Sequence, residues 1–273
     1  MSNIHRIMTL GLALLMALAL AAPALAQGAD DAHVRVAHLS PDAPNVDVYV
    51  NGEPALTDVP YTTISEYLPL PAGTQQVTVY ATGDTTTPVI DTPVALAAGG
   101  AYTVAAVGLL ADESLTAQVY EDDLSAPAEG NSKVRVVHAS PDAGPVDIVP
   151  RGGDALVSGL EFPSASPYAE VPAGTYTLDV NAAGTDQTAL TVPDAALASG
   201  ANYSAFAVGT VYADSLQVLL VQDNAGATAT ATAAASERHL PDTGGSTWLP
   251  LSAALALTLS GVLALALVRR RAA

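Results

Sequence analysis

Two short stretches bring a histidine, a serine and an aspartate close together. They are His38-Leu39-Ser40-Pro41-Asp42 and, 100 positions later, His138-Ala139-Ser140-Pro141-Asp142. These are the residue types of a nucleophilic triad, in which histidine accepts the proton of a serine hydroxyl. The Ser-Pro-Asp order is more typical of a turn whose side chains bond to nearby backbone amides, and no glycine-rich elbow carries the serine. We therefore expect buried structural histidines and no catalytic residues.

Clustered acidic residues are the next candidates for chemistry. Asp112-Glu113 and Glu121-Asp122-Asp123 supply neighbouring carboxylates, but in the later half of the chain only Asp214 and Asp223 remain at the equivalent places. Calcium takes about six to eight oxygen ligands, often several from one loop. No histidine spacing suits zinc. We predict no metal and no cofactor, and keep a calcium- or glycan-binding, lectin-like module as an alternative.

Aromatic and lysine side chains offer two further kinds of chemistry. Tyr49 and Tyr80 lie on strand faces opposite the valines, where they could form a surface for glycans, although paired tyrosines on strands are usually packing contacts. Lys133 is the only lysine. The first half of the chain therefore cannot form a lysine crosslink of the kind that some pilins use. We expect Lys133 to be a charge on an edge strand, which discourages aggregation.

The C-terminal region combines a pentapeptide, an apolar run and a basic tail. The pentapeptide is Leu240-Pro241-Asp242-Thr243-Gly244, and residues 249–268 are long enough to cross the hydrocarbon core, about 30 Å thick. The arginines at 269–271 would stay in the cytoplasm. This arrangement resembles a sortase sorting signal. The resemblance implies cleavage between Thr243 and Gly244 by a sortase-like transpeptidase, which joins Thr243 to an amine of the cell envelope or peptidoglycan.

The N-terminal region has the features of a secretory signal peptide. A basic residue, Arg6, precedes an apolar run over 10–22, and Ala24-Leu25-Ala26 supplies the small residues of a cleavage site. We therefore expect an exported protein held at the cell surface, anchored to the cell wall or to the membrane by a C-terminal helix.

The charge and cysteine content narrow the class of the exported part. The chain between the two terminal segments contains all 27 acidic residues but only five basic residues, so its net charge is strongly negative. The basic residues are Arg35, Lys133, Arg135, Arg151 and Arg238. Such an acidic chain repels nucleic acid. There is no cysteine, so each domain must be held by its hydrophobic core without disulfides.

The middle of the chain is a tandem repeat. His33–Ala43 returns as Lys133–Ala143, and Pro71–Thr74 returns as Pro172–Thr175, so the period of about 100 residues indicates two whole domains. Valines alternate with other residues, as at Val34 and Val36, and turn signals separate these runs. We predict an all-β protein with two tandem antiparallel immunoglobulin-like β-sandwich domains.

The repeat itself resembles a family of exported bacterial modules known as domain of unknown function number 4397. The openings Val34–Ala43 and Val134–Ala143, with the later Pro-Ala-Gly-Thr turns, carry this resemblance. It covers most of 34–123 and 134–223. It implies a β-sandwich in a secreted or surface setting, and no catalytic residues.

These observations predict the following organisation: signal peptide 1–26, first repeat 32–123, linker 124–132, second repeat 133–223, Ala/Thr-rich stalk 224–239, sorting motif 240–244, transmembrane helix 249–268 and cytoplasmic tail 269–273. The expected function is non-enzymatic: display of two β-sandwich modules at the cell surface for adhesion, spacing or binding of an extracellular glycan or protein. The alternatives are the lectin-like module and a secreted hydrolase.

Overall fold

The computed structural model describes residues 31–224 and 232–233, and every regular element in them is a β-strand. Residues 31–224 belong to one compact unit of the chain. The described residues hold no helix that is long and apolar enough to cross a bilayer. The predicted signal peptide, the sorting motif, the transmembrane helix, the tail and most of the stalk lie outside the described residues.

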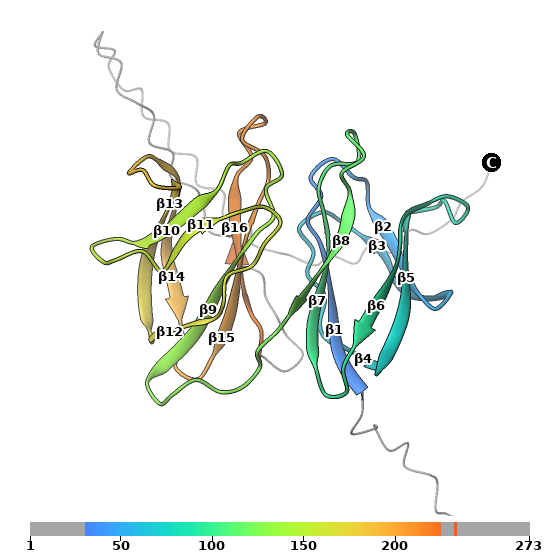
Figure 1. Ribbon diagram of the computed structural model, residues 1–273, viewed down its shortest axis with the longest axis horizontal. Helices are drawn as coiled ribbons and strands as arrows, with labels where there is room; N and C mark the ends of the chain where they lie inside the picture. The colour runs from blue at the N-terminus through green and yellow to red at the C-terminus, as the bar shows by residue number, and fades with distance from the viewer. Residues whose placement is uncertain (1–30, 225–231, 234–273) are drawn as a thin grey trace, which may run out of the picture. The chain divides into compact units, whose positions relative to one another are not determined.

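The first repeat is a sandwich of two four-stranded sheets (Figure 1). One sheet has the order β4-β1-β7-β8 and the other the order β3-β2-β5-β6. The strands are β1 Asp31–His38, β2 Val46–Val50, β3 Glu53–Val59, β4 Leu68–Pro71, β5 Gly73–Ala81, β6 Pro88–Leu96, β7 Ala101–Val107 and β8 Thr116–Glu121.

The second repeat has the same strand order in both sheets. Its sheets are β12-β9-β15-β16-β17 and β11-β10-β13-β14, in which only β17 has no counterpart among the described strands of the first repeat. The strands are β9 Asn131–His138, β10 Val146–Pro150, β11 Val157–Leu160, β12 Ala169–Pro172, β13 Gly174–Ala182, β14 Thr188–Leu197, β15 Asn202–Val208, β16 Gln217–Gln222 and β17 Thr232–Ala233. The prediction of two tandem all-β domains is confirmed.

One strand pair in each repeat corrects the prediction of an antiparallel sandwich. β1 runs parallel to β7, from His33 beside Ala101 to His38 beside Ala106, and β9 runs parallel to β15. The other pairs between the described strands are antiparallel. Parallel neighbours need a long crossover, and here the chain between β1 and β7 passes through the opposite sheet.

The core of each repeat lies between its two sheets. Val34, Val48, Val79 and Val104 belong to the core cluster of the first repeat. Ile148 and Val180 belong to that of the second repeat. Successive side chains on a strand point to opposite faces, so the alternating valines line one inner face of each sheet. The turn at Asn51-Gly52 has positive φ at both residues, as a tight hairpin between β2 and β3 requires.

A second apolar layer joins the two repeats. All residues of β7 and of β15 are buried, so each of these strands has protein on both faces. One cluster of buried residues draws on both repeats: Ala37, Leu39, Ala105, Val107, Tyr120, Val137, Ala139, Phe206, Val208, Leu219 and Val221. The sheet containing β1 and β7 therefore packs against the sheet containing β9 and β15. We call this layer the inter-repeat interface.

Candidate functional site

The histidine of the first repeat is buried and makes structural contacts. The side chain of His38 is inaccessible to solvent, and its Nε2 lies 3.0 Å from the carbonyl oxygen of Pro44. Ser40 Oγ donates to Asp42 Oδ1 over 3.2 Å. The Asp42 carboxylate also accepts hydrogen bonds from the backbone amides of Leu110 and Ala111. Asp42 therefore keeps a local contact with Ser40, but its bonds to the amides of Leu110 and Ala111 tie its turn to the β7–β8 loop and not only to nearby residues as predicted.

The second repeat has the same arrangement. His138 is 1% exposed, and its Nε2 lies 3.1 Å from the carbonyl oxygen of Gly144. Asp142 accepts from the amides of Val211 and Tyr212 over 2.8 and 2.9 Å. A ring nitrogen that faces a carbonyl must carry the proton. Each histidine is thus a neutral donor that holds the loop after its strand.

The buried histidines predict a loss of stability on acidification. Burial lowers the pKa of both His38 and His138, and the bond to a carbonyl opposes this only partly. Below a pH of about 6.5 the unfolded chain therefore binds more protons than the folded chain. Stability should fall with decreasing pH, by up to about 1.4 kcal/mol per pH unit for each histidine, until the pH reaches the folded pKa values.

The measurement is urea denaturation of residues 27–239 between pH 7.5 and 5.5, a window above the titration of carboxylates. The double variant His38→Gln and His138→Gln should be less stable at pH 7.5 and should lose most of the pH dependence. His33→Gln is the control, because His33 is exposed, and it should keep the wild-type slope. An unchanged slope in the double variant would refute the assignment.

Three of the acidic residues considered for calcium, Asp122, Asp123 and Asp223, form ion pairs with basic side chains. Asp223 Oδ1 lies 2.7 Å from Arg35 Nη2, and Asp122 Oδ1 is bonded to Arg135 Nη2. Asp123 Oδ2 lies 2.7 Å from Lys133 Nζ. Across the described residues, no three or more acidic, histidine or cysteine side chains are grouped closely enough to hold a metal ion.

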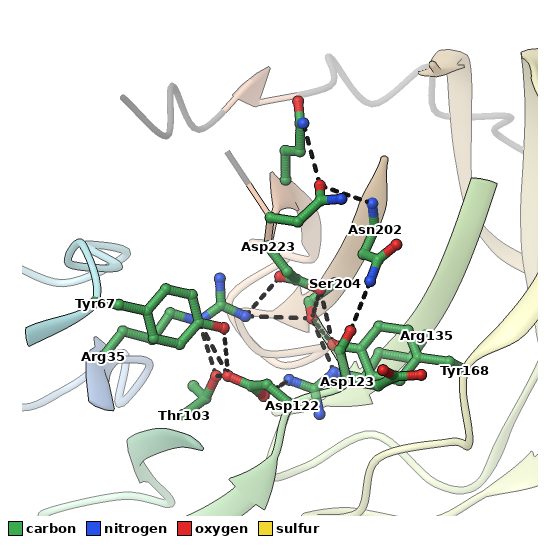
Figure 2. A network of polar contacts seen from close by, with 12 residues as sticks. Arg35, Tyr67, Thr103, Asp122, Asp123, Arg135, Tyr168, Asn202, Ser204 and Asp223 are labelled. Carbon is green, nitrogen blue, oxygen red and sulfur yellow. Dashed lines mark hydrogen bonds and ion pairs between the residues drawn. The ribbon is translucent and has the colours of Figure 1, made fainter. Parts of the chain in front are cut away.

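A buried polar network crosses the inter-repeat interface. Figure 2 shows Arg35 of the first repeat between two sets of acceptors. Within its own repeat, Arg35 Nε donates to Thr103 Oγ1 over 2.8 Å. Across the interface, its Nη2 bonds to Asp223 Oδ1 and, over 3.3 Å, to Ser204 Oγ. Arg35 thereby bonds to both repeats at once.

Arg135 repeats this pattern in the reverse direction. Its Nε donates to Ser204 Oγ of its own repeat over 2.8 Å. Its Nη2 bonds to Asp122 of the first repeat, and its Nη1 donates to the carbonyl oxygen of Glu121. Each arginine therefore pairs with the aspartate of the other repeat, so the two ion pairs cross the interface in opposite directions.

The remaining oxygens of the two aspartates are occupied by hydroxyl groups of their own repeats. Asp122 Oδ2 accepts from Tyr67 over 2.5 Å and from Thr103 over 2.7 Å. Asp223 Oδ2 accepts from Tyr168 over 2.8 Å and from Ser204 over 2.9 Å. Buried charges are tolerated when they are paired and their hydrogen-bonding capacity is used. The network meets this condition with two positive and two negative groups.

Two tyrosine rings complete the network. The guanidinium carbon of Arg35 lies 4.9 Å from the ring centre of Tyr67, and that of Arg135 lies 4.9 Å from the ring centre of Tyr168. Burial raises the pKa of both tyrosines, so their hydroxyls remain donors. Burial alone would lower the pKa of Arg35, but the carboxylates of Asp223 and Asp122 raise it. The two tyrosine hydroxyls and the Arg35 guanidinium therefore keep their protons near neutral pH.

Lys133 fastens the linker, and its assignment to an edge strand is wrong. β9 lies between β12 and β15, because the parallel crossover brings β15 alongside it. Lys133 Nζ donates to Asp123 Oδ2 and to Ser125 Oγ, each over 2.7 Å. This bond holds the pKa of Asp123 at about 2. Asn202 Nδ2 donates to the carbonyl oxygens of Asp123 and Ser125, so the start of the linker is held on two sides.

The two tyrosines considered for glycan binding contact each other. Tyr49 on β2 and Tyr80 on β5 are half-buried, and their rings meet edge to face with centres 5.4 Å apart. Edge-to-face pairing across strands stabilises a sheet. In this arrangement neither ring lies flat beside the other to form a broad platform.

No sequence motif marks the residues of the crossing network, but two signals point to them. Arg35 and Arg135 occupy the same place in both repeats, as do Asp122 and Asp223. The strands at 101–107 and 202–208 are also nearly continuous runs of small and apolar residues, which is typical of strands buried on both faces.

Fold and site together define a tandem β-sandwich protein whose two modules share one buried, charged interface. The chain belongs to the family described as Domain of unknown function (DUF4397), whose model matches residues 32–149 and 149–245. No curated protein matches the chain.

Proposed function

We propose that this chain is a non-enzymatic cell-surface protein that displays two immunoglobulin-like β-sandwich modules as one unit, for adhesion, spacing or ligand binding. The observation that carries the proposal is the crossing network. Arg35 with Asp223, and Arg135 with Asp122, place the buried charged groups of both repeats in contacts between the repeats. An enzyme keeps such groups available to a substrate.

The terminal segments support the anchoring part of the proposal. The apolar stretch over 10–22 and the Ala24-Leu25-Ala26 pattern favour export. The pentapeptide at 240–244, the apolar stretch at 249–268 and the arginines at 269–271 favour attachment through a sortase-like transpeptidase. In this proposal the envelope or peptidoglycan is the covalent partner, and the two modules face the exterior.

Fractionation of the host cells tests the anchoring. The wild-type chain should enter the cell-wall fraction and be released by enzymes that digest peptidoglycan. Thr243→Ala should move it to the membrane fraction, because the substitution removes a side chain of the pentapeptide that the transpeptidase would recognise. Thr247→Ala, outside the pentapeptide, is the control and should leave the distribution unchanged. Recovery of the wild-type chain from the cytosol would contradict the proposal.

A binding screen separates adhesion from spacing. Residues 27–239 contain every described strand and can be applied to glycan arrays and to immobilised matrix proteins. Saturable binding to one class would identify an adhesin, whereas no binding in either screen would favour a spacer. Hydrolysis of ester or glycoside substrates by the same fragment would contradict the non-enzymatic assignment.

A further inference from the structure

Most edge strands of the four sheets are protected against the addition of a further strand. An edge strand carries unpaired amides and carbonyls that can capture another chain, and proline blocks this because it lacks the amide donor. Prolines lie in the edge strands β3 (Pro54), β4 (Pro69 and Pro71), β6 (Pro88 and Pro93), β12 (Pro172) and β14 (Pro193). The edge strand β11 has no proline, but it is only four residues long and pairs irregularly with β10.

The edge strand β8 of the first repeat has none of these protections. It is six residues long, contains no proline or lysine, and keeps a regular register with β7. The N–H of Asp122, directly after β8, donates to the carbonyl oxygen of Ala101 over 2.8 Å. Because antiparallel residues alternate in the direction of their backbone groups, those of Ala117 and Val119 face away from β7. No other described strand pairs with this side of β8.

The equivalent edge of the second repeat is covered by a strand from the Ala/Thr-rich stalk. β16 takes the place of β8 in the strand order, and Leu220 takes the place of Val119. β17 pairs with β16, with Thr232 opposite Leu220. Residues 227–233 alternate alanine and threonine, which is the period of a strand, and threonine favours strands. The edge at β16 thus shows which kind of segment suits the edge at β8.

We propose that β8 pairs with residues 225–236 of a second copy of this chain, which we call the Ala/Thr segment. A strand has two edges, so the segment keeps β16 of its own copy on one side and adds β8 of its neighbour on the other. Main-chain hydrogen bonds supply the affinity in such strand addition. The contact joins different surfaces of the two copies, so it continues from copy to copy.

Charge favours the Ala/Thr segment over a direct contact between the sheet edges of two copies. The segment contains no charged residue, whereas the two repeats are strongly acidic and repel each other. The inference goes beyond the proposed surface function, because it names a partner and does not depend on how the chain is anchored.

The first test titrates a synthetic peptide of residues 225–236 into isotope-labelled residues 27–239. NMR should show saturable shifts and slower hydrogen exchange at the amides of Ala117 and Val119. Ala117→Pro removes an amide that faces away from β7, so β8 should keep its pairing with β7 but bind the peptide about tenfold more weakly. Ala117→Ser is the matched control, because it keeps the amide, and it should bind as the wild type does.

The second test measures the association of residues 27–239 by sedimentation velocity. The wild-type fragment should form species that grow with protein concentration. The double variant Thr230→Pro and Thr232→Pro should remain monomeric, because proline prevents the segment from pairing as a strand. This variant changes no residue of β1 to β16, so both sandwiches should still fold.

Three results would overturn the proposal. They are the absence of shifts at β8 up to the solubility of the peptide, a wild-type fragment that stays monomeric at every concentration, and association that persists in the Thr230→Pro and Thr232→Pro variant. Equal loss of peptide binding in Ala117→Ser and Ala117→Pro would overturn the role of the outward-facing amide of β8.

Discussion

Replacing Arg35 with methionine should lower the free energy of unfolding by about 3–5 kcal/mol. The side chain of Arg35 is 2% exposed and bonds to Asp223 across the interface, with Asp122 3.7 Å away. Methionine retains much of the apolar stem but leaves the facing carboxylates without their positive partner. An uncompensated charge in the interior costs far more than the lost contact itself.

Urea denaturation of residues 27–239 at pH 7.5 measures this effect. Arg151→Met is the matched control, since it removes the same group from a pair with Asp179 in which the arginine side chain is 62% exposed. Exposed ion pairs contribute at most about 1 kcal/mol to stability. The loss in the free energy of unfolding should therefore be several-fold larger for Arg35→Met than for Arg151→Met. If Arg35→Met were as mild as the control, the crossing network would not hold the repeats together in solution.

Replacing Phe206 with alanine should lower the free energy of unfolding by about 3–5 kcal/mol. Phe206 lies on β15, is completely buried and belongs to the cluster that draws on both repeats. Its ring centre also lies 5.8 Å from the guanidinium carbon of Arg35. The equivalent position of the first repeat is Ala105, which cannot fill the space left by the lost ring.

The same denaturation experiment applies here, with Phe206→Leu as the conservative control. Leucine keeps most of the apolar volume, so Phe206→Leu should lower the free energy of unfolding by less than half as much as Phe206→Ala. Because Phe206 and Arg35 are in contact, their combined substitution should deviate from additivity by about 0.5 kcal/mol or more. A loss below about 0.5 kcal/mol for Phe206→Ala is typical of exposed positions. That result would mean that β15 has one face in solvent.

The two predictions bear directly on the proposed function. A shared interface makes the repeats unfold together, so damage on one side destabilises both. For a surface protein this coupling has a mechanical meaning, because the modules keep one relative orientation instead of moving independently on a short linker. The bonds of Lys133 and Asn202 to the start of that linker act in the same sense.

Much of each individual repeat could be predicted from the chain. The period of about 100 residues required two domains of one kind, and the alternating valines marked the inner faces of their sheets. The Asn51-Gly52 pair predicted a tight turn, and both residues have positive φ. These signals lie in consecutive residues, so they can be recognised without knowing which strands are neighbours.

Which strands lie next to each other could not be predicted from the sequence. The parallel pairs β1–β7 and β9–β15 join residues about 68 positions apart. The period of two is the same for parallel and antiparallel strands, and it therefore does not reveal the crossover. For the same reason the sequence pattern does not show that the strand of Lys133 has neighbours on both sides.

Periodicity and turn chemistry lie in consecutive residues, so local patterns are sufficient to predict two related β domains, each with an apolar inner face. What covers the outer face of β7 and β15, and the pairing of Arg35 with Asp223 and of Arg135 with Asp122, became known only from the folded chain. The pattern of a strand distinguishes its two faces, but it does not show whether water or another sheet lies against the second face. That choice depends on contacts between residues as many as 188 positions apart.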